Sequence, residues 1–231
     1  MHHDVFRNIV SIRASQDLFD DLSNDPADWA LAQHAEAQSK PYAYRSKVPI
    51  VDRPFEEAEW LSAIRWPFEH WQHSRYSDGS FGLWYGAGSA ETTVYETAFH
   101  WFTGLLQDAG FDQPSSPVVA ERKLYSVACD AALIDVRPQI QNFPQLVHPS
   151  DYLLTQSLGA RLHREGHPGL ITASVRDVEH GSVGDCYVVL NAKILSNPRH
   201  LCQATYRLDQ GRIFIEKQIG VSWITISTSN W

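Results

Sequence analysis

Strand-like segments crowd the second half of this chain, and this arrangement limits its fold more than any other feature. Five apolar segments fit strands there: residues 169–175, 185–195, 203–208, 212–217 and 221–227. Asp209, Gln210 and Gly211 predict a hairpin turn between two of them. A doubly wound parallel sheet would need regular alternation of strand and helix, which is missing. The sequence therefore predicts an α+β fold, with a mixed, mostly antiparallel sheet flanked by helices.

The first third of the chain predicts two helices. Residues 14–40 look helical but polar, with Asp25 as the N-cap and Pro26 at the first helical position. Residues 54–73 predict a short, Trp-rich helix that is interrupted at Pro67. These segments precede the predicted sheet.

Two more helices and two strands are predicted between residues 81 and 165. A helix over about 89–106 follows the N-cap Ser89, and a helix over about 150–165 follows Ser150 or Asp151 as its cap. The predicted strands are residues 81–85, which a turn at 86–88 ends, and residues 122–130, which residues 133–136 extend.

The composition is that of an ordinary globular protein, with 43% apolar and 20% charged residues. The length of 231 residues suits one large domain, and no repeat or low-complexity linker marks a boundary. The formal net charge of −8 disfavours direct binding of nucleic acid, because nucleic-acid binders usually carry a basic face.

The cysteines and the apolar segments predict the compartment. Cys129, Cys186 and Cys202 form no CxxC motif, and their odd number argues against a disulfide framework, so a reducing interior is expected. The N-terminus has no apolar leader, and no stretch approaches 18 uninterrupted apolar residues. We therefore expect a cytoplasmic protein without a membrane segment.

Residues 74–96 carry the most informative pattern. Arg75 precedes a predicted strand, Tyr85 ends that strand, and Glu96 lies two turns into the next helix. Glu96 shares a helix face with His100 and two threonines and lies away from the apolar stripe. Taken alone, a helical glutamate or a single arginine is more often a solvated surface residue.

A second candidate stretch spans residues 166–176. Ser174 and Arg176 lie near the end of an apolar strand that runs into a polar loop, a common place for functional groups. His163 and His167 have an HxxxH spacing, but Gly166 closes the helix that a zinc pair would need, so no metal site is expected. The glycines around residue 86 match no dinucleotide fingerprint, and no nucleophile elbow occurs.

Taken together, these motifs resemble the RES domain family, the toxin half of RES–Xre toxin–antitoxin systems, which is named for an Arg, a Glu and a Ser. The resemblance runs from about residue 44 to residue 200, within a single domain over 1–231 that adds an N-terminal helical extension and C-terminal strands. The motifs that carry it occur in the family's order: Tyr44-Arg45, Arg75, Tyr85, Glu96, Gly169 to Ser174-Val175-Arg176, and Asn197-Pro198-Arg199-His200.

The resemblance implies a fold similar to that of ADP-ribosyltransferases, with NAD as the substrate. It implies Arg75, Glu96 and Ser174 as catalytic residues, and Tyr44, Arg45 and Tyr85 as NAD-binding residues. Guanidinium groups suit the two phosphates, and a carboxylate beneath the ribose suits the positive charge that develops when the nicotinamide bond breaks. The tyrosines would supply flat walls, and the serine hydroxyl would orient the substrate.

Three hypotheses about activity follow from the resemblance. The first is an NAD-consuming toxin that passes ADP-ribose to water or phosphate, as a glycohydrolase or phosphorylase. The second is an ADP-ribosyltransferase that modifies a cellular protein, and the third is a non-catalytic binding domain that has kept only the fold. The family also implies a small Xre-type helix-turn-helix antitoxin as partner, which would make the DNA contacts. The oligomeric state stays open, with a homodimer among the options.

Overall fold

The computed structural model describes residues 2–10, 55–108, 110, 114, 116–178, 183–218 and 220–231. The predicted helix at 14–40 and the predicted pair Tyr44-Arg45 lie outside these residues. Nine strands form one sheet in the order β11-β10-β9-β5-β1-β4-β8-β7-β6. They are β1 (His2–Val10), β4 (Trp84–Ala87), β5 (Val118–Asp130), β6 (Ile134–Asp135), β7 (Gly169–Ala173), β8 (Asp185–Val189), β9 (Leu195–Asp209), β10 (Arg212–Gln218) and β11 (Val221–Ser227).

Neighbouring strands in this sheet are antiparallel, except that β6 pairs with β7 in parallel. Helices pack against it, so the prediction of a single α+β domain with a mixed, mostly antiparallel sheet is confirmed. A second, two-stranded sheet joins β2 (His73–Ser74) and β3 (Ser77–Asp78).

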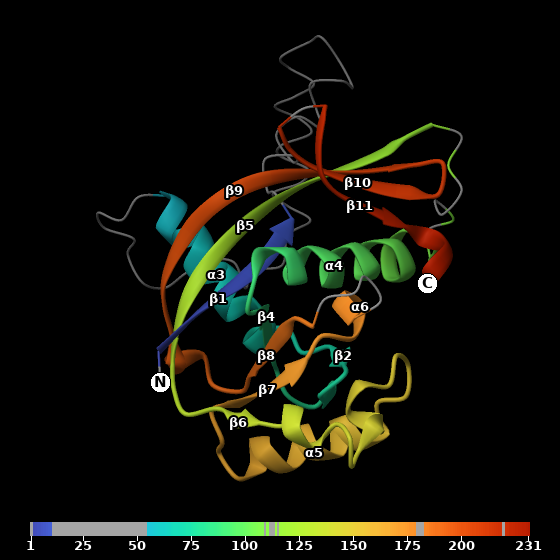
Figure 1. Cartoon of the computed structure of the whole chain (residues 1–231). Helices are drawn as coiled ribbons and strands as arrows, with labels where there is room; N and C mark the ends of the chain where they lie inside the picture. Colours follow the sequence, from blue (N-terminus) through green and yellow to red (C-terminus); the bar gives the residue numbers. More distant parts are fainter. Residues whose placement is uncertain are drawn as a thin grey trace, which may run out of the picture.

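The large sheet is nearly divided between β1 and β4. These two strands pair at a single position, Phe6 with Ala87, whereas β1 pairs with β5 over nine residues. The long strands β5 and β9 curve as an arch over the rest of the molecule, and the short strands β4, β8 and β7 lie below it (Figure 1). Two half-sheets that diverge from one point leave a cleft between them, and the candidate site lies there.

Helices cover the two faces of the sheet. They are α3 (Phe55–Glu69), α4 (Ala90–His100), α5 (Leu153–Arg164) and α6 (Val175–Val178), and a six-residue π-helix, η2 (Trp101–Leu106), continues α4. Short 3-10 turns occupy η3 (Arg137–Gln139), η4 (Pro144–Val147), η5 (Ala192–Ile194) and η6 (Thr228–Asn230). None of the helices among these residues is long and apolar enough to cross a membrane.

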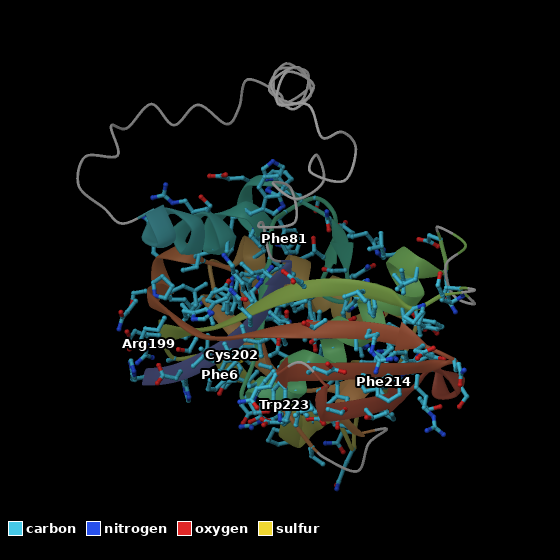
Figure 2. The ribbon with its side chains drawn as sticks, turned by 90° about the horizontal axis from the view of Figure 1, so that it is seen from above. Phe6, Phe81, Arg199, Cys202, Phe214 and Trp223 are labelled. Atoms are coloured by element: carbon cyan, nitrogen blue, oxygen red, sulfur yellow. The ribbon has the colours of Figure 1, made fainter. Side chains whose placement is uncertain are left out.

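Successive side chains of β5 point to opposite faces of the sheet and so pack into two separate hydrophobic cores. Leu124 packs with Val94 and Ala98 of α4 and with the inner faces of β9, β10 and β11. Val127, on the opposite face, packs with Ile64 of α3. Viewed from above, β5, β9, β10 and β11 lie side by side, with Cys202 on β9, Phe214 on β10 and Trp223 on β11 (Figure 2). A third core lies between α5 and the strands β7 and β8.

Several predicted elements are confirmed. The strand at 221–227 and the hairpin turn before β10 are present, and Gln210 and Gly211 take the positive φ values of 47° and 70° that a two-residue hairpin requires. Ser89 caps α4 by accepting a hydrogen bond from the Thr92 amide at 3.0 Å. Gly166, with a φ of 75°, closes α5 as predicted.

Other predicted strands are wrong in their limits. The segment 133–136 does not extend β5, because β6 instead pairs with β7 at the far edge of the sheet. The predicted strand at 185–195 ends at Val189 as β8, and the 3-10 turn η5 follows it; the predicted strand at 203–208 begins earlier, because β9 starts at Leu195. The predicted turn at 86–88 is also wrong, since β4 runs through Gly86. A Cβ at Gly86 would lie 2.5 Å from Val5, so the glycine allows a close strand crossing and does not make a turn.

The helix limits also differ from prediction. Pro67 does not interrupt α3 but lies in its last turn, where the helix ends two residues later. The N-cap of α5 is Tyr152, neither Ser150 nor Asp151, although Asp151 accepts a hydrogen bond from the Leu153 amide at 3.1 Å. Strand β1 was not predicted at all, yet it lies in the middle of the sheet.

Candidate functional site

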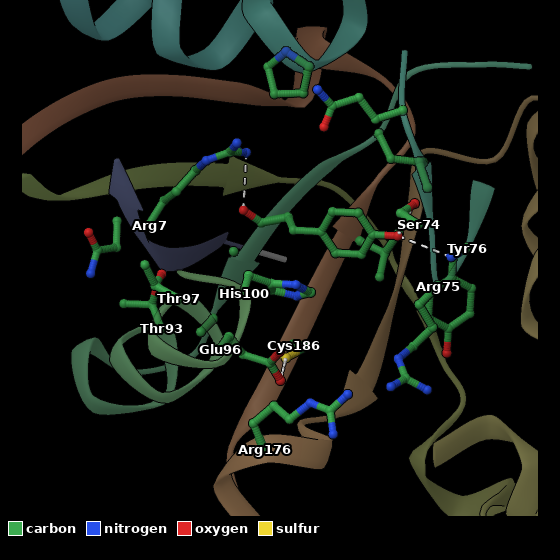
Figure 3. Close-up of a pocket in the computed structure, with 18 of the residues that line it drawn as sticks. Arg7, Ser74, Arg75, Tyr76, Thr93, Glu96, Thr97, His100, Arg176 and Cys186 are labelled. Atoms are coloured by element: carbon green, nitrogen blue, oxygen red, sulfur yellow. Dashed lines mark hydrogen bonds between the residues drawn. The ribbon is translucent and has the colours of Figure 1, made fainter. Parts of the chain in front are cut away.

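A cleft of about 660 Å³ opens between the half-sheets, beside α4 (Figure 3). This volume lies within the range of small-molecule pockets, ~300–1,000 Å³. The charged side chains among its lining residues are four arginines and one glutamate, in a chain whose net charge is −8. They are Arg7 of β1, Arg75 of the β2–β3 turn, Arg122 of β5, Arg176 of α6 and Glu96 of α4. Arg75, Tyr85 and Glu96, three of the predicted site residues, all line this one cleft.

Arg75 lies on a turn that is held from two sides. On one side, Thr155 of α5 donates to the Arg75 carbonyl at 2.5 Å, and Gln156 donates to the Ser74 carbonyl at 2.9 Å. Helix α5 approaches this turn so closely that a Cβ at Gly159 would lie 1.9 Å from the Tyr76 carbonyl oxygen. The turn that presents Arg75 is therefore rigid before any ligand binds.

Tyr85 holds the same turn from the other side. Its buried hydroxyl pairs with Ser74 Oγ at 2.9 Å and accepts from the Tyr76 amide at 3.1 Å. Burial raises the pKa of this phenol well above its usual value, so it stays protonated at neutral pH. The ring lines the cleft, as a predicted flat wall would, and the hydroxyl has the additional task of fixing the turn of Arg75.

Glu96 projects from α4 into the cleft, and one of its two oxygens is already committed. Ser174 Oγ donates to Glu96 Oε1 at 2.6 Å, and Cys186 Sγ contacts the same oxygen at 3.5 Å. Burial is the largest cause that raises the pKa of the Cys186 thiol, and the Glu96 charge adds to it, so the sulfur keeps its proton and can donate it. Within the described part of the chain, Oε2 has no hydrogen-bond partner and is free for a ligand.

Ser174 lies behind Glu96 and is not among the residues that line the cleft. Only 1% of its surface is exposed, and its hydroxyl accepts the Asp177 amide at 3.1 Å, as the N-cap of α6. The structure therefore brings Ser174 to the predicted site but gives it a different contact from the expected one. Its hydroxyl orients Glu96, whereas the sequence predicted that it would orient the substrate.

Arg75 and Arg176 are both anchored by the segment that leads into α5. Arg75 donates to the His148 carbonyl at 2.6 Å, and Arg176 donates to the Pro149 carbonyl at 2.9 Å. Each guanidinium also lies over an aromatic ring, Arg75 over Tyr152 at 4.6 Å and Arg176 over Phe99 at 3.4 Å from the ring centroid. Figure 3 shows both guanidinium groups extending into the space beside the Glu96 carboxylate.

Sequence reasoning missed Arg7 and Arg122, which line the cleft from β1 and β5. Arg7 donates to the Tyr85 carbonyl at 3.2 Å and lies 5.1 Å from the Trp84 ring centroid, and Arg122 lies 5.7 Å from the Tyr206 centroid. Burial lowers the pKa of both guanidinium groups. Among the residues with described positions, no carboxylate forms an ion pair with Arg7, Arg75 or Arg122. The cleft is therefore electropositive.

The resemblance included Arg45 and not Arg7, and no sequence motif singled out Arg7, which the structure places in the cleft. Tyr44 and Arg45 lie outside the described residues, so their predicted role stays a prediction. Asn197 takes a φ of 49° at an irregularity near the start of β9, and neither it nor His200 lines the cleft.

Comparisons with known proteins agree with the predicted family. The sequence model of the family described as "RES domain" matches residues 51–209, well over half of the chain, so this protein belongs to the RES domain family. A search of curated proteins found no match. Among solved structures, a chain from the crystal structure of the M. tuberculosis MbcT-MbcA toxin-antitoxin complex is similar, with a TM-score of 0.43 and 12% sequence identity. The match covers 88% of this chain and 83% of that chain.

Proposed function

We propose that this protein is an NAD-consuming toxin of a toxin–antitoxin system, which cleaves the nicotinamide–ribose bond and passes ADP-ribose to water or phosphate. The observation that carries this proposal is the Glu96 carboxylate, whose Oε2 has no hydrogen-bond partner among the described residues, in a cleft whose other charged groups are arginines. Membership of the RES domain family supports the same class of activity.

The arginines suit the diphosphate of NAD. A guanidinium group can donate two parallel hydrogen bonds to a phosphate, and such charge-assisted bonds are stronger than neutral ones. Arg75 and Arg7 have no carboxylate partner among the described residues, and their guanidinium groups are held by backbone carbonyls. A bound diphosphate would supply the missing negative charge on that side of the cleft.

Glu96 suits the sugar. Breaking the bond to nicotinamide develops positive charge on the ribose, as in glycoside cleavage, and a fixed carboxylate stabilises that charge. Ser174 and Cys186 hold Oε1, so Oε2 can face the ribose and accept a hydrogen bond from one of its hydroxyl groups. Water, which releases one proton to the solvent, or phosphate then forms the new bond at the anomeric carbon, and neutral nicotinamide leaves with the electrons of the broken bond.

A cognate antitoxin belongs to the same proposal. The similar solved structure is described as a toxin–antitoxin complex, and RES toxins are expected with a small Xre-type helix-turn-helix partner. The net charge of −8 leaves DNA contacts to such a partner. Co-expression of the neighbouring open reading frame, followed by purification of a complex, tests this part of the proposal.

Release of nicotinamide by the purified protein tests the proposed activity. The protein is prepared free of any inhibitor and incubated with NAD, with and without phosphate, and free nicotinamide is separated by chromatography. Steady release that depends on the protein is expected, and a phosphate-dependent product would identify a phosphorylase. Labelled NAD added to a cell lysate separates the alternative, because only a transferase leaves label on a discrete protein band. An inhibitor-free protein that leaves NAD intact in every arm would contradict the proposal.

A further inference from the structure

Two hydrogen bonds, donated in opposite directions, join the short helix α6 to α4. Ser174 Oγ donates to Glu96 Oε1 at 2.6 Å, and Thr92 Oγ1 donates to Asp177 Oδ2 at 2.7 Å. Thr92 and Glu96 are four residues apart on α4 and so lie on one face of the helix. Ser174 and Asp177 are the N-cap and the third residue of α6. We refer to these four residues as the α4–α6 ladder.

The part of the ladder that lies behind Glu96 is buried. Thr92, Ser174 and Asp177 are each 1% exposed, and none of the three lines the cleft. Asp177 Oδ1 is buried with no hydrogen-bond partner in the part of the chain that the structure describes. A buried carboxylate that uses only one of its oxygens opposes folding stability. Stability alone therefore does not explain why a carboxylate stands here, one hydrogen bond away from the helix that carries Glu96.

The hydrogen bonds of the ladder run in a defined direction. The Ser174 hydroxyl accepts the Asp177 amide at 3.1 Å, so its single proton is available for Glu96. The Thr92 hydroxyl proton goes to Asp177, so Ser89, 2.8 Å from Thr92 Oγ1, donates to Thr92. The cap of α4 and the cap of α6 are thus joined through Thr92 and Asp177.

Gly184 allows the ladder to close. Its carbonyl accepts the Ser174 amide at 2.7 Å, and a Cβ at this position would lie 2.2 Å from both Asp177 Oδ2 and Thr92 Oγ1. Any side chain larger than that of glycine would push the Thr92–Asp177 contact apart. The chain therefore packs backbone directly against this contact.

We propose that Thr92 and Asp177 are positioning residues, which fix α6 against α4 so that Ser174 holds Glu96 Oε1 and leaves Oε2 facing the substrate. Its kinetic test rests on the proposed cleavage of NAD, whereas its geometric test does not. Neither residue touches the cleft, so both act through Ser174 and Glu96. Loss of the ladder would let the Glu96 carboxylate rotate, and an error of about 1 Å in a reacting group can cost on the order of 100-fold in rate.

The kinetic test compares Thr92→Val with Thr92→Ser. Valine has the shape of threonine but no hydroxyl, and serine keeps the hydroxyl. We expect Thr92→Val to lower kcat for nicotinamide release about 10- to 100-fold with the KM for NAD nearly unchanged, and Thr92→Ser to restore most of the rate. Thr103→Val is the matched control, because the Thr103 hydroxyl donates to the Phe99 carbonyl in the same helical run, away from the ladder. Equal kcat in wild type and Thr92→Val would overturn the proposal.

Crystal structures of the variants give a readout that needs no turnover. The Ser174 Oγ–Glu96 Oε1 distance, 2.6 Å in the wild type, is expected to lengthen in Thr92→Val and to persist in Thr92→Ser. If Thr92→Val does not fold, Gly184→Ala serves instead, because its methyl group separates the same contact. An unchanged distance in the folded variant would overturn the positioning role. A wild type that releases no nicotinamide would contradict the proposed function alone, and the distances would still decide the role of the ladder.

Discussion

The two sides of the cleft differ in how their charged side chains are held. On the side of α4, the Glu96 carboxylate accepts two contacts from neighbouring side chains and is fixed before a ligand arrives. On the side of β1 and β5, Arg7 and Arg122 are partly buried without a carboxylate partner among the described residues. A preorganised group serves the transition state, whereas a charge without a counter-ion serves the binding of an anion. For the proposed cleavage of NAD, this difference predicts that the first side sets the rate and the second side sets the affinity.

Removing the charge of Glu96 should have the largest effect. Glu96→Gln keeps the size of the side chain but removes the negative charge that we propose stabilises the ribose cation. We expect kcat for nicotinamide release to fall about 10²–10³-fold, with little change in KM, because the loss is confined to the transition state. Steady-state kinetics on the purified variant measure both values. A rise in KM with an unchanged kcat would show that Glu96 contributes to the binding of NAD and not to the rate. This result would contradict the proposed difference between the two sides of the cleft.

Removing an arginine should show the opposite signature. Arg7→Met keeps much of the apolar length of the side chain and loses the charge. We expect KM for NAD to rise roughly 10- to 100-fold with kcat changed much less, since a hydrogen bond to a charged group contributes about 1.5–3 kcal/mol. Arg161→Met is the matched control, because Arg161 pairs with Glu165 on the exposed surface of α5. Equal kinetics in the Arg7 variant and the control would show that β1 does not contribute to binding.

Tyr85→Phe separates the two roles of Tyr85, which lines the cleft with its ring and holds the turn of Arg75 with its hydroxyl. The variant keeps the ring that lines the cleft and loses the hydroxyl that holds the turn of Arg75. We expect kcat/KM to fall by about tenfold, as is typical when a buried hydrogen-bonding partner is removed. Tyr187→Phe on β8 removes a hydroxyl that contacts His3, outside the cleft, and should leave kcat/KM unchanged. An unaltered Tyr85→Phe enzyme would mean that α5 alone holds the turn.

The smallest expected effect is on the pH dependence of the free energy of unfolding. The pKa of the Cys186 thiol is raised in the folded protein, chiefly by burial, so the folded state keeps a proton that the unfolded chain releases at alkaline pH. The free energy of unfolding therefore decreases as pH rises above the ordinary thiol pKa. This group contributes up to about 1.4 kcal/mol of that decrease per pH unit. Denaturant titrations between neutral pH and pH 10 measure the slope. Cys186→Ser, which does not titrate in this range, should give a shallower slope, and an equal slope would contradict the assignment.

The sequence predicted the fold class and part of the site for identifiable reasons. Arg75, Tyr85 and Glu96 lie within one continuous stretch, in which the helix capped by Ser89 was predictable from local sequence, although the turn expected at 86–88 was not found. Ser174 was found through its strand end, but its contact with Glu96 depends on how α6 packs against α4, which no local pattern encodes. The pairing of β6 with β7 was missed for the same reason.

Strand β1 and its Arg7 were not predicted, because residues 2–10 show no clear alternation of polar and apolar residues. The segment from His2 to Val10 mixes polar and apolar residues, and its place beside β5 is set by pairing with residues more than a hundred positions away. Long-range pairing of this kind is a tertiary effect that overrides local preference. The two arginines that line the cleft from β1 and β5 were therefore the part of the candidate site that the sequence did not reveal.

Calorimetric titration of NAD into the Glu96→Gln variant tests the division between the two sides most directly, because this variant should bind NAD without consuming it. We expect saturable binding with a Kd close to the KM of the wild type. We also expect that adding Arg7→Met to Glu96→Gln weakens this binding about tenfold or more. Absence of binding to Glu96→Gln, or equal binding with and without Arg7, would contradict the proposed division of rate and affinity between the two sides of the cleft.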